Sequence, residues 1–316
     1  MDFPHLTTPP TRVINASTTK MSQAEAPKTE ELELEKRNFI SLLEKRQIAA
    51  NTLLCVGLDS DFSKLPAAYK YYGIRIVLQE FNRSIIQATE DLVCAYKPNI
   101  AFYEEHGNTG FDALLWTTEF IRKEYPDIPI ILDAKRTDIG NTNLPYARMA
   151  FDYFGADAIT VNPYFGGEAI QPFLDRKDKG VIVLCRTSNP GAKEFQDLLV
   201  DHPELGRVPL YQVVAYRAAH EWNKNGNVCL AVGATYPEEL VQVRKIVGDM
   251  PILVPGLGAQ GGKPEDIAAA LNSQKRGIIA NNARGIIFAP PQEGENFAQA
   301  ARREALKWRD AINQYR

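Results

Sequence analysis

The chain has 316 residues, of which 45% are hydrophobic and 24% are charged, and its formal net charge is −3. This composition is typical of a globular protein with a large core, and it excludes a chain-wide basic surface for nucleic acid or an anionic membrane. No apolar stretch reaches the length of a membrane span, which is about 18 residues. The four cysteines lie in separate apolar runs without a CxxC pair, so we expect buried thiols, no structural zinc and a cytoplasmic protein.

The amino-terminal region is expected to have two parts. Residues 1–28 contain four prolines among many Ser and Thr residues and show no hydrophobic periodicity, which predicts a disordered or loosely attached arm. A helix is expected from Thr29, whose hydroxyl can cap it, with an apolar face that includes Phe39, Ile40 and Leu43. We therefore expect an arm, 1–28, followed by a single catalytic domain, 29–316.

Eight short apolar runs follow, and each is continuous rather than alternating in polarity. They begin near Leu53, Leu92, Ile130, Ala158, Val181, Val228, Ile252 and Gly277. Such runs are typical of parallel strands that are buried on both faces. Helical stretches lie between them, at 79–91, 111–124, 145–154, 209–223, 237–247 and 264–271, and a last one covers 296–316. The alternation predicts a (β/α)8 TIM barrel with an extra N-terminal helix, in preference to a doubly wound sheet.

The connection from Arg186 to Pro209 is long for a barrel loop and is rich in Asn, Pro, Gly and charged residues. Long loops at the carboxyl ends of strands often close over a bound substrate. A plain surface excursion is the other interpretation, and the sequence leaves both open.

Polar side chains gather where the predicted strands end. They are Asp59, Lys97, Asn99, Asp133, Lys135 and Asn162, and Asp138 follows in a loop. Because Asp133 and Lys135 are two apart, they fall on the same face of their strand, toward the barrel axis. A salt-bridge network that only closes the barrel would also pair these charges. Four charges of alternating sign on three neighbouring strands favour chemistry instead.

A second group of residues predicts an anion site. The glycine-rich segment 255–262 follows the seventh strand, and Arg284 ends the eighth. Loops at these two places form the usual phosphate site of a (β/α)8 barrel, and arginine adds a bidentate contact. The glycines alone could merely make a tight turn. Together with Arg284 they favour a phosphorylated small molecule as the ligand.

Several motifs are absent from the sequence. It has no HExxH, no aspartate-rich metal loop and no dinucleotide fingerprint after the first strand, and the four histidines lie away from the strand ends. We therefore expect no metal and no cofactor, and a site built from lysine and aspartate.

These strand-end motifs resemble those of the orotidine 5′-monophosphate decarboxylase family. The residues 132–142, LDAKRTDIGNT, contain the family's Asp-x-Lys-x-x-Asp-Ile…Thr pattern. The other segments that look like the family's strand-end motifs, in the family's order along the chain, are VGLDSDF, YKPNIAFYE, LCRTSNPG, PGLGAQGG and NNARG. The resemblance covers about 39–315. The leading helix and the long connection suggest the family's longer-loop branch.

The resemblance implies a role for most of these residues. Lys135 would deliver a proton to pyrimidine C6 as carbon dioxide leaves, held in place by Asp133. Asp59 and Lys97 would bind the ribose hydroxyls. Asp138, beside the substrate carboxylate, and Thr142, on a ribose hydroxyl, would be donated across a homodimer interface. The other implied substrate-binding residues are Ile139, Thr187 or Ser188 at the pyrimidine edge, Gln260 between pyrimidine and phosphate, and Gly258 and Arg284 at the phosphate. Asn99 and Asn162, at strand ends near these charges, are further candidate substrate-binding residues, and neither is assigned a specific contact.

The sequence leaves two alternative functions and one possible partner protein to consider. A sugar-phosphate decarboxylase or aldolase of the same superfamily would use magnesium and an acidic residue at the end of the second strand, where Lys97 stands here. A non-catalytic nucleotide-binding barrel is the other alternative, and Lys135 between two aspartates counts against it. The chain has no Asp-Asp pair of the kind a fused phosphoribosyltransferase needs, so we expect a stand-alone enzyme that can associate with a separate orotate phosphoribosyltransferase.

Overall fold

The computed structural model describes residues 37–65, 72–235, 237–258 and 261–316, which all belong to one compact unit, Lys36–Arg316. Eight parallel strands form its centre: β1 (Leu54–Leu58), β2 (Ala95–Pro98), β3 (Ile131–Arg136), β4 (Ala158–Val161), β5 (Gly180–Arg186), β8 (Val228–Val232), β9 (Ile252–Pro255) and β10 (Ile278–Asn282). Their order is β2-β1-β10-β9-β8-β5-β4-β3, and isolated bridges join β2 to the β3 segment. The predicted (β/α)8 barrel is confirmed.

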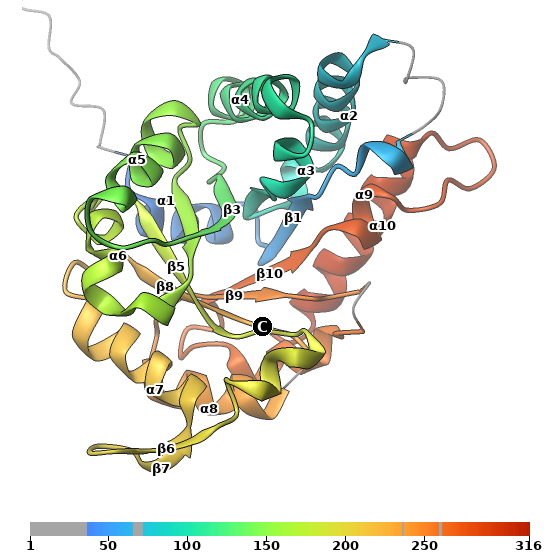
Figure 1. Cartoon of the computed structure of the whole chain (residues 1–316). Coiled ribbons are helices and arrows are strands. Elements are labelled where there is room, and N and C mark those ends of the chain that lie inside the picture. The colour runs from blue at the N-terminus through green and yellow to red at the C-terminus, as the bar shows by residue number, and fades with distance from the viewer. Residues whose placement is uncertain (1–36, 66–71, 236, 259–260) are drawn as a thin grey trace, which may run out of the picture. The chain divides into compact units, whose positions relative to one another are not determined.

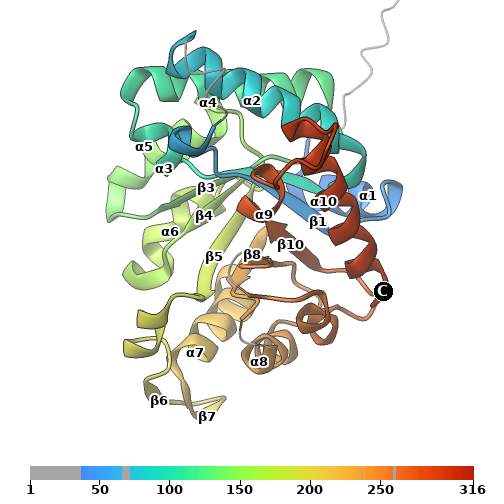
Figure 2. The same cartoon turned by 90° about the vertical axis from the view of Figure 1, so that its right-hand side faces the viewer.

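Helices surround the strands, as both views of the molecule show (Figures 1 and 2). They are α2 (Ile74–Thr89), α3 (Ala101–Glu104), α4 (Gly107–Glu124), α5 (Asn143–Arg148), α6 (Gly166–Leu174), α7 (Leu210–Arg217), α8 (Pro237–Val247), α9 (Arg284–Ile287) and α10 (Phe297–Asn313). Most match the predicted stretches, but 264–270 is a 3-10 helix, and α5 and α7 end in π-helical turns. None of the helices in the described part of the chain is long and apolar enough to cross a membrane.

The inward-facing residues of the strands form two layers. The lower layer is apolar and includes Cys55, Ala95, Ile131, Ile182, Leu253 and Ile279. Because side chains alternate along a strand, the next inward position lies two residues closer to the carboxyl end. These upper positions include Lys97, Asp133 and Asn281, which are polar. The barrel therefore has an apolar floor beneath a polar mouth.

Helix α1 (Phe39–Ala49) covers the amino end of the barrel. Phe39 and Leu43 belong to the same buried cluster as the lower layer, and a Cβ atom at Gly180 would collide with the Phe39 ring. Asn38 has an extended backbone and its side chain accepts a hydrogen bond from the Ser41 amide. The predicted helix start at Thr29 is therefore wrong, because this helix begins after the Asn38 cap. The predicted arm, 1–28, and the domain boundary lie outside the described residues.

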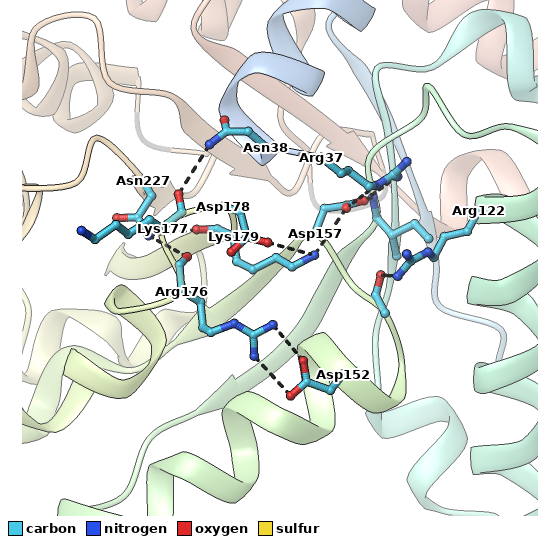
Figure 3. Close-up of polar contacts among 12 residues, drawn as sticks. Arg37, Asn38, Arg122, Asp152, Asp157, Arg176, Lys177, Asp178, Lys179 and Asn227 are labelled. Atoms are coloured by element: carbon cyan, nitrogen blue, oxygen red, sulfur yellow. Dashed lines mark hydrogen bonds and ion pairs between the residues drawn. The ribbon is translucent and has the colours of Figure 1, made fainter. Parts of the chain in front are cut away.

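A network of charged residues lies at the same end of the barrel (Figure 3). The buried Asp157 carboxylate accepts hydrogen bonds from Arg37 Nε at 2.5 Å and from the Ile130 amide at 2.9 Å, and Lys179 Nζ lies 4.0 Å away. Burial lowers the pKa of Lys179, although Asp157 and Asp178 oppose this effect. These charges are paired with one another at the end opposite the polar mouth, so the mouth remains the candidate site.

The long connection after β5 contains structure that the sequence analysis did not predict. A 3-10 helix covers Pro190–Glu194, and a hairpin of β6 (Leu199–His202) and β7 (Gly206–Pro209) projects beyond α7 (Figure 2). The available sequence signal was Pro203, which follows β6 directly, together with Gly206 at the start of β7. Helix α6 was also missed, because two glycines and Pro172 weaken its helical pattern.

Candidate active site

The carboxyl ends of the strands surround a cavity of about 440 Å³, a size typical of small-molecule sites. Eight of the predicted site residues line it: Asp59, Lys97, Asn99, Asp133, Lys135, Thr187, Ser188 and Arg284. Five others do not, namely Asp138, Ile139, Thr142, Asn162 and Gly258. Gln260 lies outside the described residues. The cavity is also lined by five polar residues that sequence reasoning missed: Thr160, Arg186, Asn189, Asn281 and Asn282.

Lys97 connects the first three strands of the barrel electrostatically. Its buried Nζ lies 2.8 Å from Asp133 Oδ2 and 3.9 Å from Asp59 Oδ1. Burial disfavours the charged form of Lys97, but attraction to Asp133 and Asp59 outweighs it and raises the pKa of the lysine above its usual range. Lys97 is therefore a fixed positive charge on the cavity wall.

Asp133 holds the second lysine. Its Oδ1 lies 2.6 Å from Lys135 Nζ and accepts a hydrogen bond of 2.9 Å from Thr160 Oγ1. Burial would raise the pKa of Asp133, but the charges of Lys97 and Lys135 outweigh it and keep the pKa well below its usual range. The carboxylate is thus ionised between two ammonium groups. The Lys135 side chain remains 49% exposed, so its ammonium can meet a ligand in the cavity.

Both Asp133 and Lys135 line the cavity, but the strand between them is not regular. Lys135 has φ of +48°, in the left-handed region, and the register of β3 against β4 shifts between Leu132 and Arg136. The prediction that Asp133 and Lys135 lie together was correct, but it assumed a regular strand between them. A β-bulge directs the lysine back toward the carboxylate two residues before it.

The segment after β3 contributes none of its predicted site residues to the lining of the cavity. The Asp138 carboxylate accepts a hydrogen bond from the Ile139 amide at 2.6 Å, and Asn143 bonds the Asp138 backbone on both sides. Ile139 is 63% exposed, and Thr142 ends a 3-10 turn. Within the described residues, no contact joins Asp138 to Lys135. Donation of Asp138, Ile139 and Thr142 to a second subunit stays a prediction.

Polar contacts within the loop after β5 join its first residues to residues about ten positions later. Gln196 accepts a hydrogen bond from the Thr187 amide and donates one to Thr187 Oγ1, both at 2.8 Å. The buried Arg186 pairs with Asp197 at 2.9 Å. The Thr187 hydroxyl also donates to Asn189 at 2.6 Å, so it is already engaged within the loop. The contacts of Gln196 and Asp197 could not be predicted from the sequence, because these residues lie about ten positions after the strand in a loop whose shape no motif indicates.

The loops after β9 and β10 are the place where the sequence analysis predicted an anion site. Gly258, at φ of +75°, donates its amide to the Gly262 carbonyl, which closes a tight turn. A Cβ atom at Gly258 would lie 2.7 Å from the buried Asn282 amide nitrogen, so the loop packs directly on the end of β10. Arg284 is the first residue of α9 and lines the cavity. A guanidinium here suits a phosphate at the side of the cavity away from β3.

The family of the chain follows from comparison with known proteins. A family model described as the orotidine 5′-phosphate decarboxylase / HUMPS family matches residues 52–298. The chain belongs to this family. An orotidine 5′-phosphate decarboxylase of Janthinobacterium sp. (strain Marseille) is 49% identical over 278 residues, which cover 88% of this chain and 98% of that protein. The corresponding protein of Ralstonia pickettii is 50% identical over 267 residues, or 84% of this chain and 94% of that protein.

Solved structures of the same family share the barrel. The OMP decarboxylase of Leishmania donovani is 37% identical and has a TM-score of 0.72, covering 88% of this chain and 99% of that chain. The UMP synthase of the same organism is 38% identical with a TM-score of 0.70, but only 56% of that longer chain is covered, together with 87% of this one. The family and the barrel that the sequence motifs predicted are both confirmed.

Proposed function

We propose that this chain decarboxylates orotidine 5′-monophosphate to uridine 5′-monophosphate without a cofactor, the last step of de novo pyrimidine biosynthesis. The observation that carries the proposal is the charge chain Lys97–Asp133–Lys135 at one side of a cavity whose other side holds Arg284. The names of the relatives in the same family support this substrate.

The proposed mechanism uses the two sides of the cavity together. The substrate phosphate binds at Arg284, with Gln260 and the Gly258 loop, and its ribose hydroxyls meet Asp59 and Lys97. As the bond from C6 to the carboxylate carbon breaks, carbon dioxide leaves and the electron pair stays on C6. The Lys135 ammonium stabilises this pair and then transfers a proton to C6. Asp133 fixes the ammonium, and solvent returns a proton to the lysine.

We also propose that the active enzyme is a homodimer in which each subunit completes the other's site. Exposed apolar side chains follow the neighbouring strands β3 and β4, as the 63% exposure of Ile139 and the 82% exposure of Tyr164 illustrate. Leu144 and Phe165 are exposed as well. Large apolar side chains in one patch are typical of protein interfaces. Burying this patch against a second copy would bring Asp138, Ile139 and Thr142 to a neighbouring cavity.

Association with a separate orotate phosphoribosyltransferase is a further proposal. It is supported by the similarity to the Leishmania UMP synthase, in which the matched part is about half of a longer chain. A size-exclusion run of the chain with such a transferase would show a shared peak if the two associate.

One assay separates the proposed reaction from its rivals. We expect the purified chain to release carbon dioxide from orotidine 5′-monophosphate at an unchanged rate when EDTA is present. Turnover that is lost in EDTA would indicate a magnesium-dependent enzyme, as a sugar-phosphate decarboxylase or aldolase would be. No turnover at all would indicate a barrel that only binds a nucleotide. Either result contradicts the proposal.

Arg284→Ala is expected to raise KM by about 100-fold or more and to lower kcat far less than a change at Lys135 does. The guanidinium binds the remote phosphate, whereas the ammonium acts at the reacting carbon. Orotidine, which lacks the phosphate, should be a poor substrate of the unmodified enzyme and should be insensitive to Arg284→Ala. Equal damage to the turnover of both substrates would mean that Arg284 is structural.

A further inference from the structure

The bulge in β3 leaves one residue of β4 opposite three residues of β3. The register pairs Leu132 with Ile159 and Arg136 with Val161. Asp133, Ala134 and Lys135 therefore all face Thr160. In a regular strand consecutive amides point to opposite sides, so only one of the Ala134 and Lys135 amides would face β4, whereas at the bulge both meet the same β4 residue.

The Thr160 hydroxyl bonds all three of these residues. It accepts hydrogen bonds from the Ala134 amide at 3.0 Å and the Lys135 amide at 2.9 Å, and it donates to Asp133 Oδ1 at 2.9 Å. A threonine hydroxyl has one hydrogen to donate and two lone pairs to accept with, so all of its capacity is used. Thr160 is buried and lines the cavity.

These three bonds act on the residues that carry the proposed chemistry. Lys135 has φ of +48°, which is uncommon for a residue with a side chain and persists only where its surroundings enforce it. Thr160 fixes the amides of Ala134 and Lys135, while Arg136 Nη1 donates to the Ala134 carbonyl at 3.0 Å from the other side. The same hydroxyl orients the carboxylate oxygen that lies 2.6 Å from Lys135 Nζ.

We propose that Thr160 is a positioning residue of the decarboxylation, which holds the Lys135 backbone in its left-handed conformation and aims Asp133 at the Lys135 ammonium. The inference rests on the proposed function, because it assigns Thr160 a role in that reaction. Arg136 supports the same segment: it forms an ion pair with Glu104, and its guanidinium carbon lies 5.6 Å from the centre of the Tyr146 ring. Thr160 alone bonds both members of the Asp133–Lys135 pair among the described side chains.

Replacement of the hydroxyl tests the proposal. Thr160→Val keeps the shape of the side chain and removes all three bonds, whereas Thr160→Ser keeps the hydroxyl. We expect Thr160→Val to lower kcat about 100-fold with KM changed by less than about threefold, because a small misplacement of a catalytic group costs on the order of 100-fold in rate. Thr160→Ser should keep kcat within about threefold of the unmodified enzyme. Initial rates on orotidine 5′-monophosphate measure both constants.

Thr52→Val is the matched control. Thr52 is also buried, and its Oγ1 accepts from the Leu54 amide at 3.1 Å and donates to the Leu92 carbonyl at 2.8 Å, at the amino end of β1. It should lose thermal stability and keep its kcat. If Thr160→Val also keeps its kcat, or if KM rises as much as kcat falls, the proposal is wrong.

A folding failure of Thr160→Val does not end the test. Thr160→Ala then takes its place, and it should show the same loss of kcat relative to Thr160→Ser. If neither variant without the hydroxyl folds while Thr160→Ser does, Thr160 serves folding and the proposal is overturned. An inactive unmodified chain would instead contradict the proposed function, so the two failures are distinguishable.

Discussion

Lys135→Ala is expected to lower kcat by at least about 10⁴-fold while the chain stays folded and still binds uridine 5′-monophosphate. The substitution removes both the positive charge that stabilises the electron pair on C6 and the proton that neutralises it, and each contribution is worth about 10²- to 10³-fold or more. The phosphate corner at Arg284 lies on other strands, so binding of the product should weaken by less than about tenfold. Rate assays and calorimetric titration with the product measure the two effects separately.

The fold should survive this change because Asp133 keeps its other partner. Lys97 Nζ lies 2.8 Å from Asp133 and is itself buried, so the carboxylate remains paired when Lys135 is lost. Lys123→Ala is the control, since Lys123 is an exposed lysine that pairs with its neighbour Glu124 on the surface. It should leave kcat and the melting temperature unchanged. A Lys135→Ala enzyme with more than about a tenth of the original kcat would remove Lys135 from the mechanism.

Much of the barrel could be predicted because buried parallel strands are continuous apolar runs. The runs predicted from Ala158 and Ile252 begin at the first residues of β4 and β9. The charged residues of the mouth could also be predicted, because the end of an apolar run marks the end of the strand. Lys97, Asp133 and Lys135 follow directly from this rule.

The remaining features depend on contacts that no local pattern encodes. The bulge that brings Lys135 to Asp133 arises from the pairing of β3 with Thr160, a residue before the end of its own strand. Gln196 reaches Thr187 only because a loop of unusual shape folds back on itself. Asp138 lies outside the cavity of its own chain, which a single sequence cannot distinguish from a place inside it.

Mixing two inactive variants is expected to restore activity. If Asp138 completes the neighbouring subunit's site, Lys135→Ala and Asp138→Ala should each be nearly inactive as homodimers. In a mixed dimer one site has both defects, and the other combines an intact Lys135 with an intact Asp138 from the partner. Random reassortment of equal amounts makes half of the dimers mixed, with one good site in two. Activity should therefore recover to about a quarter of that of the unmodified enzyme, as an isologous two-fold interface requires.

The controls make this experiment decisive. Each variant is unfolded and refolded alone, and exchange of subunits in the mixture is demonstrated with two distinguishable affinity tags. Recovery only in the mixture would show that Asp138 acts across the interface, consistent with its absence from the lining of its own cavity. If subunits exchange and no activity returns, Asp138 serves its own barrel. A conformational change of the segment after β3 would then be needed to bring its carboxylate to Lys135, and the exposed apolar patch around Ile139 would need another explanation.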